Sequence, residues 1–109
     1  MVNEFNEQLD RNGYAQSIMQ FEDHCFICYR NGPKARHEVF HGPLRKKAKR
    51  LGLWVNLCPL CHYEVHNGDG KLDLILKRNG QSAAMSRYNW SVDEFRWNFG
   101  KNYLEDEDG

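Results

Sequence analysis

The run Cys58-Pro59-Leu60-Cys61-His62-Tyr63-Glu64-Val65-His66 places a Cys-x-x-Cys pair directly before two histidines. Cys25 and Cys28 form a second such pair, and the two pairs use all 4 cysteines of the 109-residue chain. Four thiolates at this spacing are the ligand set of a closed, tetrahedral zinc site. We therefore predict a structural Zn²⁺ ion that joins two distant segments of a small protein. Its ligands would be Cys25, Cys28, Cys58 and Cys61.

Disulfide bonds are the alternative for these cysteines, and the cellular compartment decides between the two. The stretch from Met1 to Glu7 is acidic and lacks the basic start and apolar segment of a secretion signal. No apolar run approaches the length that spans a membrane. We expect a cytoplasmic protein, and in a reducing compartment paired cysteines are more often metal ligands than disulfides.

His62 and His66 lie on an expected helix, because Pro59 suits the first turn of a helix that stops near Asn67. Residues four apart on a helix face the same way, so the two imidazoles can bind a second divalent ion. Glu64 would lie roughly 200° around the helix from His62, which excludes the His-Glu-x-x-His site of metalloproteases. His37, on an expected strand, is the natural third ligand. The open alternative is that His62 or His66 replaces a cysteine at the zinc site.

The chain is short enough for a single domain of the α+β class. Strands are expected at residues 37–40 and 53–57, with a basic helix at 44–51 between them that Gly52 ends. Further helices are expected at 3–11, at 71–88 (one helix, or two around Asn79 and Gly80) and after the capping box at 91–94. This order predicts a zinc-stabilised ββα finger (25–66) framed by N- and C-terminal helices, a helical part (71–104) and an acidic tail (105–109). The expected core includes Trp54, Trp90, Trp97 and the C-terminal phenylalanines.

The formal net charge is zero, but the basic residues are concentrated in one block. Between Arg30 and Arg50, eight lysines and arginines stand against one acid, Glu38. Such a block is typical of a surface that binds a polyanion, with a solvated helix face as the alternative. We predict that it binds DNA phosphates and makes no sequence-specific contacts to bases. The predicted phosphate contacts are Arg36, Arg45, Lys46, Lys47, Lys49 and Arg50.

Three motifs together resemble the HNH endonuclease family, whose zinc-containing members share a ββα-metal finger. They are Cys25-x-x-Cys28, His37-Glu38-Val39-Phe40 and Cys58-x-x-Cys61-His62-x-x-x-His66. The segments 36–42, 52–55 and 99–104 further resemble small phage and prophage HNH-like, recombination-type nucleases. The resemblance implies a metal-dependent DNA endonuclease that acts in phage replication or recombination inside a bacterial host. It also implies a catalytic Mg²⁺ or a divalent transition metal, and a recombination or host protein as a further partner. No membrane and no small-molecule cofactor are expected.

In the family pattern, His62 and His66 take the metal positions on the helix, and a strand histidine removes a proton from the attacking water. If His37 is that base, Arg36 falls on the ligand position; if His37 is the ligand, Glu38 falls on the base position. A positioned imidazole accepts a proton near neutral pH better than an unshifted carboxylate. We therefore favour His37 as the base.

Glu38 or His41 would then complete the metal site, although His41 is otherwise typical of a surface histidine. Asn56 lies closer to the second cysteine pair than the middle asparagine of the family does. Two other functions stay open. One is a non-catalytic zinc module that binds DNA or a recombination partner, and the other is a zinc-stapled protein that binds a host factor through its acidic tail.

Overall fold

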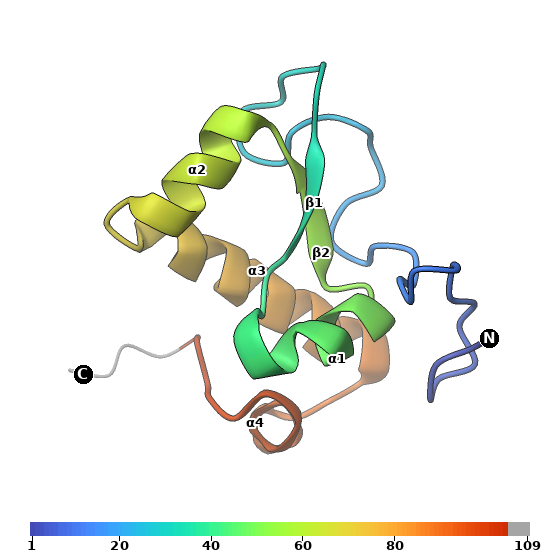
Figure 1. Ribbon diagram of the computed structural model, residues 1–109. Coiled ribbons are helices and arrows are strands. Elements are labelled where there is room, and N and C mark those ends of the chain that lie inside the picture. Colours follow the sequence, from blue (N-terminus) through green and yellow to red (C-terminus); the bar gives the residue numbers. More distant parts are fainter. Residues whose placement is uncertain (105–109) are drawn as a thin grey trace.

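The computed structural model describes residues 1–104, so the predicted acidic tail at 105–109 lies outside the described residues. Within the described part the chain is a compact structure with a two-stranded sheet, four α-helices and a radius of gyration of 13.7 Å, which confirms the predicted α+β class (Figure 1). The elements are β1 (Ala35–Glu38), the 3-10 turn η1 (Gly42–Leu44), α1 (Arg45–Arg50), β2 (Trp54–Leu57), α2 (Pro59–Asn67), α3 (Lys71–Tyr88) and α4 (Val92–Phe99).

The two strands form an antiparallel pair in which His37 lies opposite Val55 and Glu38 opposite Trp54. Helix α2 follows β2 directly and packs against both strands, while α1 connects the end of β1 to the start of β2 (Figure 1). The predicted strand at 37–40 overlaps β1, although β1 begins earlier, at Ala35, and ends at Glu38. The strand that carries His37 is therefore held beside the helix that carries His62 and His66.

The helix ends follow the expected local chemistry. Pro59 is the first residue of α2, and Gly52, just beyond α1, adopts a φ of 72° that glycine tolerates. Ser91 and Glu94 form the predicted capping box of α4. Of the two possibilities for residues 71–88, the structure has the single continuous helix α3.

Aromatic rings fill the core between β1 and the C-terminal helices. The Phe40 ring lies 5.5 Å from Phe95 and 4.7 Å from Phe99, centroid to centroid, and all three residues are buried. The expectation that Trp97 joins this core is wrong, because its side chain is 89% exposed. Phe95 and Phe99 are one helical turn apart, whereas Trp97 is two residues from each and faces the opposite side of α4.

Gly80 lets α3 approach the strand connection closely, and we expect Gly80→Ala to destabilise the protein. A Cβ at this position would lie 2.8 Å from Val39 Cγ2 and 3.0 Å from Phe40 Cε2. Overpacking typically costs about 1–3 kcal/mol, which exceeds the gain of at most about 1 kcal/mol in helix propensity. Denaturant titration should show a net loss of about 1 kcal/mol. Ser82→Ala, at an exposed position of the same helix, is the matched control; equal effects of both changes would contradict the close approach.

The expectation of a helix at residues 3–11 is wrong, because no helix occurs among residues 1–34 of the described chain. Isolated bridges between Val2 and Gln8 and between Leu9 and Ala15 fold this segment into turns. The side chain of Asn3 accepts hydrogen bonds from the backbone N–H groups of residues 5 and 7. The Asp10 side chain does the same for residues 12 and 14. Such local bonds compete with helix formation, so within residues 1–104 the predicted finger region (25–66) is followed by helices but is not preceded by one.

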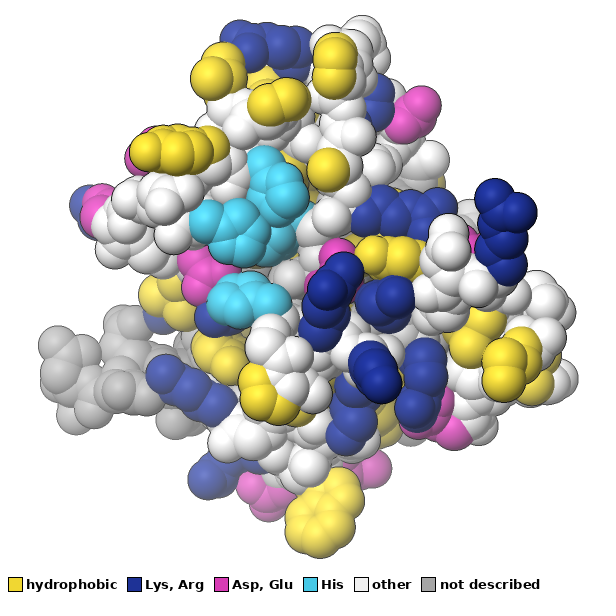
Figure 2. All heavy atoms as spheres, viewed as in Figure 1, with side chains coloured by type: hydrophobic (Ala, Val, Ile, Leu, Met, Phe, Trp, Pro, Cys, Tyr) yellow, Lys and Arg dark blue, Asp and Glu magenta, His cyan; other side chains and the backbone are white. Residues whose placement is uncertain are grey.

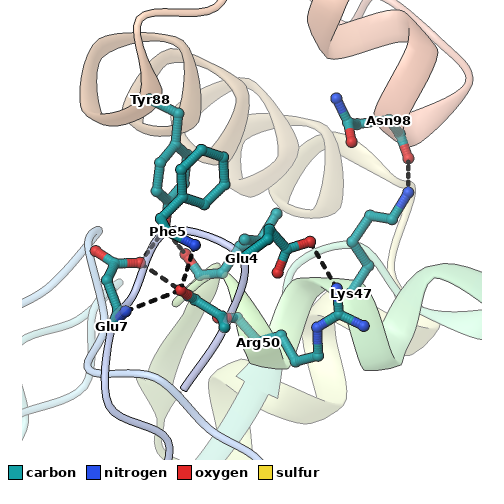
Figure 3. Close-up of polar contacts among 9 residues, drawn as sticks. Glu4, Phe5, Glu7, Lys47, Arg50, Tyr88 and Asn98 are labelled. Atoms are coloured by element: carbon teal, nitrogen blue, oxygen red, sulfur yellow. Dashed lines mark hydrogen bonds and ion pairs between the residues drawn. The ribbon is translucent and has the colours of Figure 1, made fainter.

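Side-chain contacts attach this N-terminal segment to α1 and α3 (Figure 3). Glu4 accepts a hydrogen bond from Arg50 at 2.6 Å, and Glu7 accepts one from the Tyr88 hydroxyl at 2.8 Å. The Phe5 ring stacks on Tyr88 at a centroid distance of 4.1 Å. The acidic N-terminal segment thus neutralises part of the basic block.

No helix within residues 1–104 is both long enough and apolar enough to cross a lipid bilayer.

Candidate metal centre

The four cysteines converge from the loop before β1 and from the β2–α2 junction. Their Sγ atoms all lie within 4.8 Å of one another, and the four thiols are not joined in disulfides. A tetrahedron with Zn–S bonds of about 2.3 Å has S···S edges of about 3.8 Å. The Sγ atoms of Cys28 and Cys58 lie 3.7 Å apart, which fits such an edge. The cluster could therefore hold a metal ion such as zinc.

The charges of these thiols also favour a bound cation. Burial would raise the pKa of Cys25, but hydrogen bonds led by the backbone of Cys28 and Cys58 lower it to about 6. The backbone N–H of Cys61 lowers the pKa of Cys58, whereas burial and hydrogen bonding to the other cysteines raise the pKa of Cys61. The cluster thus carries thiolate charge near neutral pH. A cation would stabilise that charge and favour loss of the remaining thiol protons.

Three imidazoles form a second group of potential ligands, distinct from the four cysteines. The potential ligand atoms of His37, His62 and His66 lie within 4.8 Å of one another. The ring centroids are 5.3 Å apart for His37 and His62, 5.1 Å for His37 and His66, and 4.8 Å for His62 and His66. Strand β1 supplies one ring, and the spacing of four residues along α2 supplies the other two. In this arrangement no histidine replaces a cysteine in the thiol cluster.

His37 is buried, with 3% of its surface exposed. Its Nε2 is the one buried side-chain nitrogen or oxygen among residues 1–104 without a hydrogen-bond partner. An unsatisfied buried polar atom typically costs about 1–3 kcal/mol, and coordination of a metal ion would satisfy this nitrogen. Burial, together with the neighbouring His62 and His66, lowers the pKa of His37 to about 4. His37 is therefore neutral at physiological pH and has a lone pair that can bind a metal ion.

The three imidazoles line a hollow of about 360 Å³ that is open to solvent. In Figure 2, histidine side chains gather on one face of the molecule over β1 and α2, and lysine and arginine side chains lie beside them over α1. A polar hollow with cationic side chains at its rim suits an anionic ligand. Its lining consists of Arg36, His37, Glu38, His41, Gly42, Arg45, His62 and His66.

Glu38 lies in this hollow as an ion-paired carboxylate. It accepts a hydrogen bond from Arg45 at 2.5 Å, and its side chain is 6% exposed compared with 62% for Arg45. Neither Glu38 nor His41 belongs to the converging ligand groups of the described residues. The expectation that one of them completes the metal site is thus not matched by the geometry, and Glu38 instead holds the guanidinium of Arg45 at the rim.

Arg36 and Asn56 lie on adjacent strands in paired register, outside the group of convergent ligand atoms. The Arg36 guanidinium lies 4.5 Å from the ring centroids of both Tyr14 and Trp54 and is paired with Asp10 at 3.0 Å. Asn56 bonds through its backbone to neighbouring loops and does not line the hollow formed by the described residues. Arg36 therefore lines the edge of the hollow, and its guanidinium is already engaged by neighbouring side chains.

The predicted phosphate-binding block does not form one uniformly available surface. Lys47 donates to the Asn98 backbone carbonyl at 2.9 Å, as Figure 3 shows, and Arg50 is paired with Glu4. Lys49 lies over the Tyr14 ring at 4.6 Å. Lys46 is exposed and makes no hydrogen bond or ion pair within residues 1–104. Lys46 and Arg45, whose side chain is 62% exposed although it is paired with Glu38, are the most available cations of α1.

For the DNA binding predicted from the sequence, this arrangement predicts that the basic residues contribute unequally to the affinity. Arg45→Gln/Lys46→Gln should weaken binding to duplex DNA and reduce the slope of log K against log salt by roughly two, because two phosphate contacts are lost. Glutamine at residue 45 can still donate to Glu38, which protects the fold. Fluorescence anisotropy over a salt series provides the measurement, with Lys47→Gln as the matched control. A larger loss in the control would contradict this assignment.

The sequence did not indicate the partner of His41. Its Nε2 lies 3.3 Å from Oδ1 of Asp73 in the first turn of α3, and Asp73 is also paired with Lys77 at 2.8 Å. Asp73 lies 32 residues after His41 in the sequence, and no motif connects the two residues. The close approach of α3 to residues 39 and 40, at Gly80, brings His41 near this helix.

Comparisons of the chain with protein-family models, curated proteins and solved structures find no significant match.

Proposed function

We propose that the protein is a metal-dependent DNA endonuclease of the HNH type, which hydrolyses phosphodiester bonds at the hollow between β1 and α2. The observation that carries the proposal is the convergence of His37, His62 and His66 on one point beside a cluster of four thiols. The resemblance of the cysteine and histidine motifs to HNH nucleases supports the same assignment. The cationic rim supports a phosphate-containing substrate.

The donor set favours a transition metal over Mg²⁺ at the second site. Imidazoles suit zinc, nickel and related ions, whereas Mg²⁺ prefers oxygen ligands and retained waters. The buried, unpartnered Nε2 of His37 also supports its role as a ligand, because a general base must be in reach of the water it deprotonates. We therefore propose His37, His62 and His66 as the three ligands, in place of the base assigned to His37 from the sequence.

The chemistry that the ion supplies when bound is Lewis-acid stabilisation of negative charge on the phosphate and on the leaving oxygen. The side chains at the rim perform the remaining tasks. We assign one phosphate oxygen to Arg45, which is held by Glu38, and a neighbouring phosphate of the strand to the exposed Lys46. The thiol cluster holds the start of α2, so it keeps two of the imidazoles in place.

Incubation of the purified protein with supercoiled plasmid and with single-stranded DNA tests the proposal. We expect nicking or cutting with Mn²⁺, Ni²⁺ or Zn²⁺, little with Mg²⁺, and none after His37→Ala. The reaction products should carry 5′-phosphate and 3′-hydroxyl ends. Absence of cleavage with every ion, or equal background cleavage by wild type and His37→Ala, would contradict the nuclease function.

The second candidate is a non-catalytic zinc module that binds DNA. Arg36 occupies the position before His37, where many family members have a metal ligand, and it is engaged by Tyr14, Trp54 and Asp10. This candidate predicts salt-dependent DNA binding that persists after His62→Ala. A tight divalent-ion site that His62→Ala abolishes, together with cleavage, would remove it.

A further inference from the structure

His41 and Asp73 form a hydrogen-bonded pair at the edge of the hollow. His41 lies between β1 and η1, and its ring centroid is 6.1 Å from that of His37 and 6.0 Å from that of His66. It lines the same hollow but is outside the group of converging ligand atoms in the described chain. Its side chain is 45% exposed, so solvent reaches it, in contrast to the buried His37.

The hydrogen-bond partner of His41, Asp73, determines which ring nitrogen of His41 carries the hydrogen atom. Burial would raise the pKa of Asp73, but hydrogen bonds from Lys77 and His41 lower it, so Asp73 is a carboxylate at neutral pH. A carboxylate only accepts hydrogen bonds, and therefore Nε2 of His41 is the donor in the 3.3 Å contact. In the neutral ring, Nδ1 then keeps its lone pair and can accept a proton.

We propose that His41 is the general base of the hydrolysis and that Asp73 positions it and fixes its tautomer. The inference rests on the proposed nuclease function and assigns a proton acceptor that the sequence motifs did not indicate. A solvent-accessible imidazole beside the three candidate ligands is better placed to meet a water molecule than either buried residue, His37 or Glu38.

In the assigned step, Nδ1 of His41 takes a proton from a water molecule in the hollow while the water oxygen forms a bond to phosphorus. The bond between phosphorus and the 3′ oxygen breaks, and its electron pair goes to that oxygen, which takes a proton from solvent. Asp73 stabilises the imidazolium until it returns its proton to solvent. The net reaction adds one water to the phosphodiester and yields a 5′-phosphate and a 3′-hydroxyl.

His41→Gln separates this role from a structural one. The glutamine amide can still donate a hydrogen bond to Asp73, but it offers no basic nitrogen. We expect the cleavage rate to fall by about 10²–10⁴-fold, the usual effect of losing a general base, with unchanged metal content and DNA affinity. His41→Ala, at the same half-exposed position, should show a similar loss of rate.

Nitrogen NMR of the imidazole provides a readout that does not depend on activity. In the wild-type protein His41 should be in the Nε2–H tautomer, and Asp73→Asn should disturb this preference because an amide can turn its NH₂ group toward the ring. Lys77→Gln is the matched control, since Lys77 contacts Asp73 through its other oxygen. This control should leave the tautomer unchanged.

The outcomes distinguish the two proposals. Equal cleavage by wild type and His41→Gln would overturn the role of His41 and leave the nuclease function intact. An Nδ1–H tautomer in the wild-type protein would overturn it regardless of activity. A wild-type protein that cleaves DNA with no ion would overturn both proposals, whereas a slow His41→Gln variant with full metal content and DNA affinity would support both.

Discussion

Cys58→Ser is expected to remove the ion from the thiol cluster and to unfold the protein. Cys58 is 3% exposed, and its Sγ accepts a hydrogen bond from the Cys61 N–H at the start of α2. Structural zinc contributes apparent binding energies of about 10–16 kcal/mol in zinc-finger peptides, whereas whole domains are stable by about 5–15 kcal/mol. Loss of the ion should therefore exceed the stability that the small core provides. Elemental analysis and far-UV circular dichroism provide the measurements.

Ser91→Ala is the matched control for Cys58→Ser, because Ser91 caps α4 through its side chain as Cys58 caps α2. Loss of an ordinary N-cap costs about 1 kcal/mol and should leave the metal content unchanged. A Cys58→Ser protein with wild-type circular dichroism and thermal stability would show that the thiol cluster does not hold the fold together.

His62→Ala/His66→Ala is expected to abolish DNA cleavage while the protein stays folded. Both rings are more exposed than the ring of His37, so their removal should cost little of the packing energy of the core. A bound ion supplies several kcal/mol of charge stabilisation, and its loss should slow cleavage by at least about a thousandfold. Single-turnover cleavage of a labelled duplex, with circular dichroism on the same sample, measures both effects.

Glu64→Gln is the control for the histidine variant, because Glu64 lies between the two histidines on α2 and is exposed. It should retain the cleavage rate of the wild type, since it is outside the convergent group of the described residues. If the two histidines can be removed without loss of rate, the assigned site is not the site of cleavage.

Short-range patterns predicted much of the local structure in residues 25–66. The Cys-x-x-Cys spacing, the four-residue spacing of His62 and His66, and the capping box each depend on residues within one turn or loop. The α+β class followed from the order of these patterns. The choice between two separate ligand groups and a histidine within the thiol cluster depends on how β1 packs against α2, and the structure has the four thiols and the three imidazoles in separate groups.

Other features depended on local side-chain hydrogen bonds and on partners distant in the sequence, which the sequence pattern did not reveal. No helix forms at residues 3–11, because the side chains of Asn3 and Asp10 accept hydrogen bonds from nearby backbone N–H groups. Trp97 is exposed because it lies on the face of α4 opposite Phe95 and Phe99, a position that its aromatic character does not reveal. The basic block appeared uniform because its partners Glu4, Asp10 and Asn98 are distant in sequence. For the same reason, the pairing of His41 with Asp73 was not predictable.

The central claim is that one chain holds two metal ions, one at the thiols and one at the imidazoles. Its most direct test is the number of ions per chain after equilibration with Zn²⁺ or Ni²⁺ and removal of unbound metal, for wild type and for His62→Ala/His66→Ala. The two separate groups predict two ions in the wild type and one in the variant. The same number in both proteins, or a single ion in the wild type, would contradict the claim.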